Sequence, residues 1–346
     1  MVDNYYFNSK TLRRLRRVIG KVFKLTEPDL KLGQLDYAEF GYETNLRGEY
    51  FQQYLYDKIN GKEPFLLTRF GCGVLLGAID YVNRPSISNI YKYLTHKTDC
   101  VGINKYTGEA LYVGDGFYPI DKASIYKFGS LIYSILPQID ILASIMKQET
   151  YFDNIYKKDL KRCAFEDMEP WRWKSPWTSA LKGKKVLVIH PFVTSIRYQY
   201  DKYWNKISHI GSGGGYLFGN EDVMPYFELE LIRAVQSKNI SNNPYDQYES
   251  WFDALEFLKG EIDKKKDFDI AILGCGAYGM PLGAYIKMKG KQAIHMGGAL
   301  QYLFGIKSKR GDEIEDIRKL YNEHWIRPLP EDIPQNYMKM ENGCYW

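Results

Sequence analysis

Strands that alternate with helices along most of the chain predict an α/β protein with a Rossmann-like, mostly parallel, doubly wound sheet. The clearest unit lies near the C-terminal end. It consists of a short apolar strand (Phe268–Leu273), a glycine-rich turn (Gly274–Gly279), a helix (Met280–Lys289) and a second strand (Gln292–Met296). The turn has the G-x-G-x-x-G pattern, in which glycines let backbone N–H groups approach a phosphate at a helix N-terminus. We therefore interpret Gly274, Gly276 and Gly279 as candidate phosphate contacts.

This unit lacks the acidic residue that a dinucleotide site places about 20 residues after the turn. Its second strand is followed by Gly297-Gly298, and the first acid beyond it is Asp312. The pattern favours a nucleotide or phosphate site of Rossmann type over an NAD site. A glycine turn that serves packing alone, without a ligand, is the alternative.

The composition is typical of a globular protein, with 346 residues, 45% hydrophobic and 26% charged. Five scattered cysteines without a C-x-x-C pair predict reduced thiols and a cytoplasmic location, and no spacing typical of a metal site is present. The N-terminus lacks the apolar core of a secretory signal, and no stretch is long and apolar enough to predict a membrane span.

Residues 1–48 are predicted to be an extension that contains a basic amphipathic helix and a linker. Lys10–Lys24 holds seven lysines or arginines and no acid, which accounts for the net charge of +5. One helical face is apolar and carries Leu12, Leu15, Ile19 and Val22. Such a helix either lies on an anionic membrane surface or packs its apolar face on its own domain. Because the rest of the chain is close to neutral, we expect no nucleic-acid partner.

We assign residues 49–335 to one domain and residues 336–346 to an aromatic tail that docks on it. Further strands are predicted at Pro64–Arg69, Ile139–Ile145 and Lys184–Ile189. Further helices are predicted at Tyr50–Lys58, Lys122–Pro137, Phe227–Val235, Trp251–Ile262 and Ile314–His324. The five glycines of His209–Gly219 predict a flexible loop.

Two of these strands end in residues suited to a ligand site. Arg69 precedes a glycine turn that begins at Gly71, where it can pair with a phosphate or carboxylate, or bond to backbone carbonyls. His190 is a candidate base or hydrogen-bond donor, or a cap for the next turn. Because the carboxyl ends of parallel strands share one edge, we expect these corners and Gly274–Gly279 to meet in one cleft.

A third candidate lies in Leu111–Pro119, which is predicted as a short strand followed by a loop. Asp115 stands between two glycines of that loop. It is either a site carboxylate at the strand's end or an ordinary β-turn aspartate.

Together these segments resemble the GT-D-like glycosyltransferase-fold proteins, a group of bacterial polysaccharide-biosynthesis and hypothetical proteins. The resemblance covers the chain from about residue 50 to its end. The motifs that carry it are the strand with RFG at 66–73, GDGFYP at 114–119, PWTSALKGKKVLVIHPF at 176–192, the βαβ unit extended to 310, NEHWIRP at 322–328 and ENGCYW at 341–346. It implies a Rossmann-like fold and a nucleotide-sugar donor.

The chain departs from that family at the motif R-F-G-D-G-E. Metal-dependent members carry two acids there, whereas this chain has Cys72 and Val74. A divalent cation needs oxygen ligands, which neither side chain supplies. Either the reaction is metal-independent, or Asp115 supplies a ligand from another loop, or the protein binds without catalysis.

The resemblance implies a transferase that moves a sugar from a nucleotide-sugar to a glycan or lipid-linked acceptor. In this hypothesis Asp115 or His190 is the base for the acceptor hydroxyl, and the basic helix holds the protein near a lipid-linked acceptor. The expected donor-site residues are Arg69, Gly71, Ser195, Gly274, Gly276, Gly279, His295, Gly297 and Gln301. The alternatives are a non-catalytic nucleotide- or glycan-binding module and an NAD(P)-dependent oxidoreductase.

Overall fold

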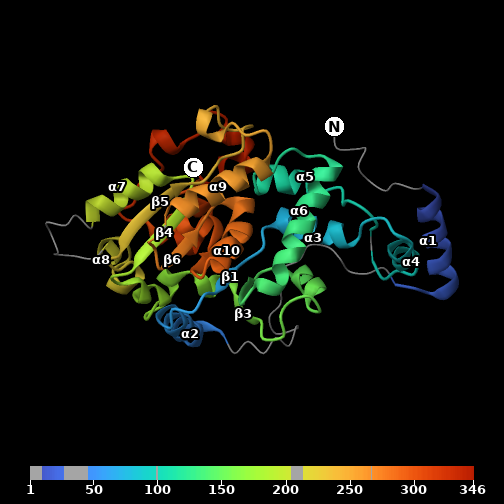
Figure 1. The fold of residues 1–346 in the computed structure, drawn as a ribbon, viewed down its shortest axis with the longest axis horizontal. Coiled ribbons are helices and arrows are strands. Elements are labelled where there is room, and N and C mark those ends of the chain that lie inside the picture. The colour runs from blue at the N-terminus through green and yellow to red at the C-terminus, as the bar shows by residue number, and fades with distance from the viewer. Residues whose placement is uncertain (1–9, 27–45, 99, 204–212, 266) are drawn as a thin grey trace.

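The computed structural model describes residues 10–26, 46–98, 100–203, 213–265 and 267–346. Seven strands form one all-parallel sheet in the order β3-β2-β1-β7-β6-β4-β5 (Figure 1). The strands are β1 (Leu66–Thr68), β2 (Ile141–Ser144), β3 (Lys161–Ala164), β4 (Lys185–His190), β5 (Glu228–Arg233), β6 (Ile270–Leu273) and β7 (Gln292–His295). The predicted α/β class with a parallel sheet is confirmed.

Helices follow most of the strands. They are α1 (Lys10–Phe23), α2 (Gly48–Asn60), α3 (Cys72–Val82), α4 (Ile87–Leu94), α5 (Thr107–Glu109), α6 (Lys122–Ile135), α7 (Val193–Tyr203), α8 (Gly213–Phe218), α9 (Trp251–Lys264), α10 (Gly279–Met288), α11 (Leu300–Leu303), α12 (Lys309–Glu313) and α13 (Glu315–Arg318). Side-chain caps fix several of their starts. At the start of α9, for example, the Ser250 hydroxyl accepts the Asp253 N–H, and the Asp253 carboxylate accepts the Ser250 N–H in return.

The two faces of the sheet carry separate hydrophobic cores because successive side chains of a strand point to opposite faces. In β1, Leu66 joins the core made with α3, α6, α9 and α10, whereas Leu67 joins the core made with α2, α7, α8 and α11. Leu187 and Val188 of β4 divide in the same way. Since both faces are covered, the interior strands are largely apolar, which explains why their runs were recognisable in the sequence.

The helices that leave neighbouring central strands pack on opposite faces. After β6 the chain enters α10 on one face, and after β4 it enters α7 on the other. The same divergence separates α3, which follows β1, from α11, which follows β7. Such divergence opens a crevice beyond the carboxyl ends of the strands, where α/β proteins bind their ligands.

Several local predictions are wrong. The segment predicted as a helix at Phe227–Val235 contains β5, whose exposed Glu228 and Glu230 alternate with more buried apolar residues. The strand β3 was not predicted, since its sequence KRCA has no apolar run. The strand expected near Leu111 is a π-helical turn, Ala110–Gly114.

Other predictions are confirmed in part or lie outside the described residues. The basic helix predicted in the N-terminal extension is α1. The helix expected from Ile314 to His324 is shorter, because α13 ends at Arg318. Of the expected glycine loop, residues 213–218 form α8, while 209–212 and most of the linker before residue 48 lie outside the described part of the chain.

Candidate functional site

A cavity lies at the carboxyl edge of the sheet, at the crevice between the diverging helices. Residues that follow β1, β4, β5, β6 and β7 contribute to its wall, together with the loop around Asp115 and the C-terminal tail. Its volume is about 90 Å³. Of the candidate residues, the structure brings Arg69, Asp115, His190, Gly274, Gly276 and Gln301 together around this cavity.

Arg69 supplies positive charge to the cavity. Its Nη1 donates to the Phe70 carbonyl at 3.0 Å, and its guanidinium carbon lies 5.6 Å from the centre of the Phe165 ring. Its Nε is buried without a hydrogen-bond partner, and no carboxylate among the described residues forms an ion pair with it. Because a guanidinium carries five N–H donors, Arg69 keeps donors available for an anion in the cavity.

Asp115 supplies a carboxylate whose place is fixed by the start of α3. The N-cap of that helix, Gly71, has no side chain, and Oδ2 of Asp115 accepts the Val74 N–H at 3.2 Å instead. Burial raises the pKa of Asp115 to about 6, and nearby Glu341 adds to this, although Arg69 and the backbone N–H groups oppose it. The carboxylate is therefore mostly ionised at pH 7 but close to its titration range.

His190 is the last residue of β4 and is buried. Its Nδ1 accepts the Phe192 N–H at 3.0 Å, and burial lowers its pKa to about 3. The neutral ring therefore carries its proton on Nε2. Of the three roles predicted for His190, the bond from the Phe192 N–H matches the cap for the next turn, and this tautomer favours a hydrogen-bond donor over a base.

The first two glycines of the G-x-G-x-x-G turn line the cavity, but they also accommodate protein groups. A Cβ on Gly274 would lie 2.7 Å from Cδ2 of His190. Gly276 has φ of +55°, and a Cβ there would lie 2.8 Å from the Asp115 carbonyl oxygen. The Ala277 N–H donates to that same carbonyl at 3.0 Å. One N–H group of the turn is thus bonded to protein, and a phosphate contact of this turn stays a prediction.

Three further candidate glycines lie behind the cavity wall, where each makes room for a side chain. They are Gly71, Gly279 and Gly297. A Cβ would lie 3.0 Å from Cγ of Asp115 at Gly71, 2.6 Å from Cε1 of His295 at Gly279, and 2.6 Å from Nε of Arg69 at Gly297. These glycines act by placing side chains, and the sequence pattern did not distinguish this role from ligand contact.

Two more of the predicted donor-site residues, Ser195 and His295, are also outside the cavity wall. Ser195 is buried at the start of α7, where its N–H and hydroxyl both donate to Oδ2 of Asp332 at 2.6 Å. His295 is buried at the end of β7, with Nδ1 3.0 Å from Oγ1 of Thr68 and Nε2 against Gly279. Burial and nearby Arg69 lower the pKa of His295 to about 3, so the ring is neutral.

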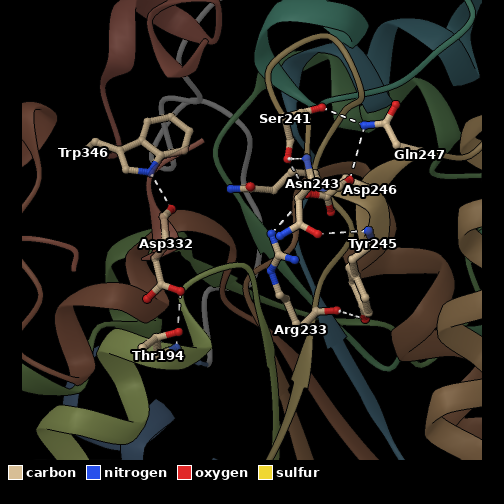
Figure 2. A network of polar contacts seen from close by, with 10 residues as sticks. Thr194, Arg233, Ser241, Asn243, Tyr245, Asp246, Gln247, Asp332 and Trp346 are labelled. Carbon is tan, nitrogen blue, oxygen red and sulfur yellow. Dashed lines mark hydrogen bonds and ion pairs between the residues drawn. The ribbon is translucent and has the colours of Figure 1, made fainter. Parts of the chain in front are cut away.

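The loop that follows β5 forms a cavity wall that the sequence did not reveal, because β5 and the first two residues of the loop were predicted as a helix. Ala234, Val235, Gln236, Ser237 and Ile240 line the cavity. Figure 2 shows how the fully buried carboxylate of Asp246 holds this loop. It accepts from Arg233 at 3.1 Å, from the Gln236 N–H at 2.9 Å and from the Ser241 hydroxyl at 2.5 Å.

The C-terminal tail forms the remaining wall, through Met340, Tyr345 and Trp346. The Trp346 Nε1–H donates to the Asp332 carbonyl at 3.1 Å (Figure 2). The Gln301 amide donates to the Tyr345 carbonyl at 3.2 Å, so Gln301 holds the tail as well as lining the cavity.

An ion pair fixes the tail beside Asp115. Arg310 pairs with Glu341 at 2.5 Å and also donates to the Cys344 sulfur at 3.1 Å. The aromatic residues of 336–346 indicated in the sequence that this tail docks on the domain. Nothing in the sequence indicated that the tail also lines the cavity. Among the described residues, no group of three or more histidines, cysteines or acids is arranged to hold a metal ion.

The chain matches no family model, no curated protein and no solved structure. Within the described residues, no helix is both long and apolar enough to cross a membrane.

Proposed function

We propose that the protein is a glycosyltransferase that moves a sugar from a nucleotide-sugar donor to a glycan or lipid-linked acceptor in surface polysaccharide biosynthesis. The observation that carries the proposal is Arg69, a guanidinium with a buried, unpartnered Nε beside a cavity at the carboxyl edge of a parallel sheet. This is the place and the charge that a diphosphate requires. The motif resemblance to GT-D-like proteins supports the same donor class.

The groups of the cavity suit glycosyl transfer. The Asp115 carboxylate accepts the proton of the acceptor hydroxyl, whose oxygen bonds to the anomeric carbon as the bond from that carbon to the donor phosphate breaks. Arg69 neutralises the departing diphosphate, and the Nε2–H of His190 donates a hydrogen bond in the same cavity. A base with a pKa of about 6 is ionised at neutral pH and still accepts a proton.

The size of the cavity adds a requirement. Sites for drug-sized ligands measure about 300–1,000 Å³, whereas this cavity measures about 90 Å³. Accommodation of a whole nucleotide-sugar therefore needs the tail that carries Tyr345 and Trp346 to shift. Because Cys72 and Val74 stand where metal-dependent GT-D proteins have acids, a metal-independent reaction is the simpler route in this proposal. The protein would work in the cytoplasm, peripherally at the inner face of the membrane.

A thermal-shift screen tests the proposal. The ligands are UDP, GDP, CMP, their sugars and NAD(H), each with and without Mn²⁺. A ligand at 100 times its dissociation constant adds about 2.7 kcal/mol, which raises the melting temperature of a chain of this length by about 4 °C. We expect one nucleoside diphosphate and its sugars to produce this shift, and Arg69→Gln to abolish it. Arg318→Gln, which replaces an exposed arginine that does not line the cavity, is the matched control.

Two results would contradict the proposal. A shift with NADH alone would support the oxidoreductase, and a nucleotide shift that survives Arg69→Gln would place the ligand elsewhere.

A further inference from the structure

The basic helix α1 docks on the protein through a polar edge. Arg16 and Gly20, one turn apart, are its buried residues. The Arg16 guanidinium donates to the carbonyls of Tyr93 and Thr98, the latter at 2.7 Å, and its carbon lies 4.4 Å from the centre of the Tyr93 ring. His96 lies 3.2 Å from the Arg16 carbonyl and packs against Gly20. This edge joins α1 to α4 and the turn that follows α4.

This docking leaves several apolar side chains of α1 exposed. Leu15, Val18 and Val22, spaced three and four residues apart, are 44%, 57% and 66% exposed, and Phe23 is 69% exposed. The sequence left open whether this side packs on the parent domain. In the described part of the chain Leu12 and Ile19 are half-buried, whereas these four side chains are exposed. Figure 1 places α1 and α4 together at one end of the long axis, away from the sheet.

A second stripe of α1 is positively charged. Arg14, Arg17 and Lys21 are exposed and lie on one side of the helix, again three and four residues apart. No acid occurs between residues 10 and 24. The helix thus presents an apolar stripe and a cationic stripe, separated by the docked edge on one side.

We propose that α1 is a docking surface for an anionic phospholipid bilayer. The charge decides between the possible occupants: a second copy of the chain would bring two uncompensated cationic stripes together, whereas anionic headgroups neutralise them. Val18, Val22 and Phe23 enter the boundary between headgroups and acyl chains, and the basic side chains remain at the headgroups. This inference does not depend on the proposed transferase activity, because it concerns a surface outside the cavity.

The docked edge gives the helix a fixed orientation. A free amphipathic peptide must order itself at the membrane, whereas α1 is already held by the Arg16 contacts with its apolar stripe outward. Position Gly20 maintains this arrangement, because a Cβ there would lie 2.6 Å from Nε2 of His96.

Cosedimentation of the full chain with vesicles tests the proposal. The vesicles contain phosphatidylcholine alone or phosphatidylcholine with phosphatidylserine at about 30%, at low and at high salt. We expect binding to the anionic vesicles only, weakened by salt. Arg14→Gln/Arg17→Gln/Lys21→Gln should weaken it about 100-fold, at about fivefold per charge. Val18→Asn/Val22→Asn keeps every charge and should weaken it at least about tenfold.

Matched variants separate this surface from general charge and hydrophobicity. Lys158→Gln/Lys174→Gln/Lys182→Gln removes three exposed lysines elsewhere, and Met288→Asn removes an apolar side chain that is 67% exposed. Neither should change vesicle binding. Circular dichroism and the melting temperature should be unchanged in all variants, since the substituted side chains are exposed.

Three results would overturn the proposal. They are equal binding to neutral vesicles, loss of binding in the distant control variants, and concentration-dependent dimerisation through Val18 and Val22 without vesicle binding. Nucleotide binding in the cavity is measured separately, so a failed vesicle assay leaves the proposed transferase activity standing.

Discussion

The side chain of Arg69 rests against the α-carbon of Gly297, where a Cβ would lie 2.6 Å from Nε of the guanidinium. The same relationship joins His190, at the end of β4, to Gly274, which follows the neighbouring strand β6. In both pairs, a glycine after one strand makes room for the polar residue at the end of another. The cavity therefore depends on its glycines even where they do not face a ligand.

Gly297→Ala should move Arg69 and weaken nucleoside diphosphate binding at least about tenfold, because the added methyl group occupies the place of the guanidinium. Its φ of +67° adds a backbone cost of about 1–2 kcal/mol to folding. Gly290→Ala is the control: its φ is +79°, but no atom lies within 4 Å of the added Cβ. The two variants should lose similar unfolding free energy in urea titrations, while Gly297→Ala alone loses binding. Equal binding by both would show that Arg69 does not need this glycine.

Asp115 should make stability pH-dependent between about pH 4 and 6. Its pKa is raised from 3.8 to about 6 on folding, so in this window the native state holds more protons than the unfolded state. Stability due to this group is therefore present below pH 4 and is lost as the pH rises to 6. The difference in unfolding free energy between wild type and Asp115→Asn should change by about 1–2 kcal/mol across the window, less than the full linkage value because the carboxyl opens to the cavity. Parallel urea-unfolding profiles would contradict the assignment.

Glu341→Gln should lower the pKa of Asp115, because the Glu341 carboxylate is one of the groups that raise it. The pH window described for Asp115 should therefore move toward lower pH, as seen by comparing Glu341→Gln with the double variant Glu341→Gln/Asp115→Asn. Glu313→Gln, an exposed glutamate of α12, should leave the window in place. A window that stays at the wild-type pH in both variants would exclude electrostatic contact between the tail and Asp115.

Asp246→Ala should destabilise the protein by about 3–5 kcal/mol, since it leaves Arg233 and the Gln236 N–H without their buried acceptor. It should also speed amide hydrogen exchange at residues 234–241, the wall of the cavity. Asp253→Ala removes an exposed capping carboxylate and should cost only about 1 kcal/mol. Unfolding and exchange measurements on both variants check this. Similar costs for the two would show that Asp246 is not the anchor of the loop.

The strands of the sheet interior were predictable because both faces of the sheet are covered. The predicted strands Pro64–Arg69, Ile139–Ile145, Phe268–Leu273 and Gln292–Met296 contain β1, β2, β6 and β7, and Lys184–Ile189 contains all of β4 except its last residue, His190. The two edge strands were missed. In β5, Phe227 and Leu231 happen to lie four residues apart, which imitates a helix, and β3 is a mixture of charged and small residues.

The position of the site was predictable, but many of its contacts were not. Arg69, His190 and Gly274 end parallel strands, so topology alone brings them to one edge. Ser195 follows one of these strands too, yet its side chain turns to Asp332, an interaction across 137 residues that no local pattern encodes. The walls supplied by residues 234–240 and by the tail depend on such long-range packing as well.

The most direct test of the central claim is turnover of the donor. Wild type and Asp115→Asn are incubated with the nucleotide-sugar that stabilises the protein, with and without Mn²⁺, and release of the nucleoside diphosphate is measured from pH 5 to 8. The account predicts release that rises with pH through about 6 in the wild type and is about 10²–10⁴-fold slower in Asp115→Asn. Binding without release, or release that Asp115→Asn leaves unchanged, would contradict it.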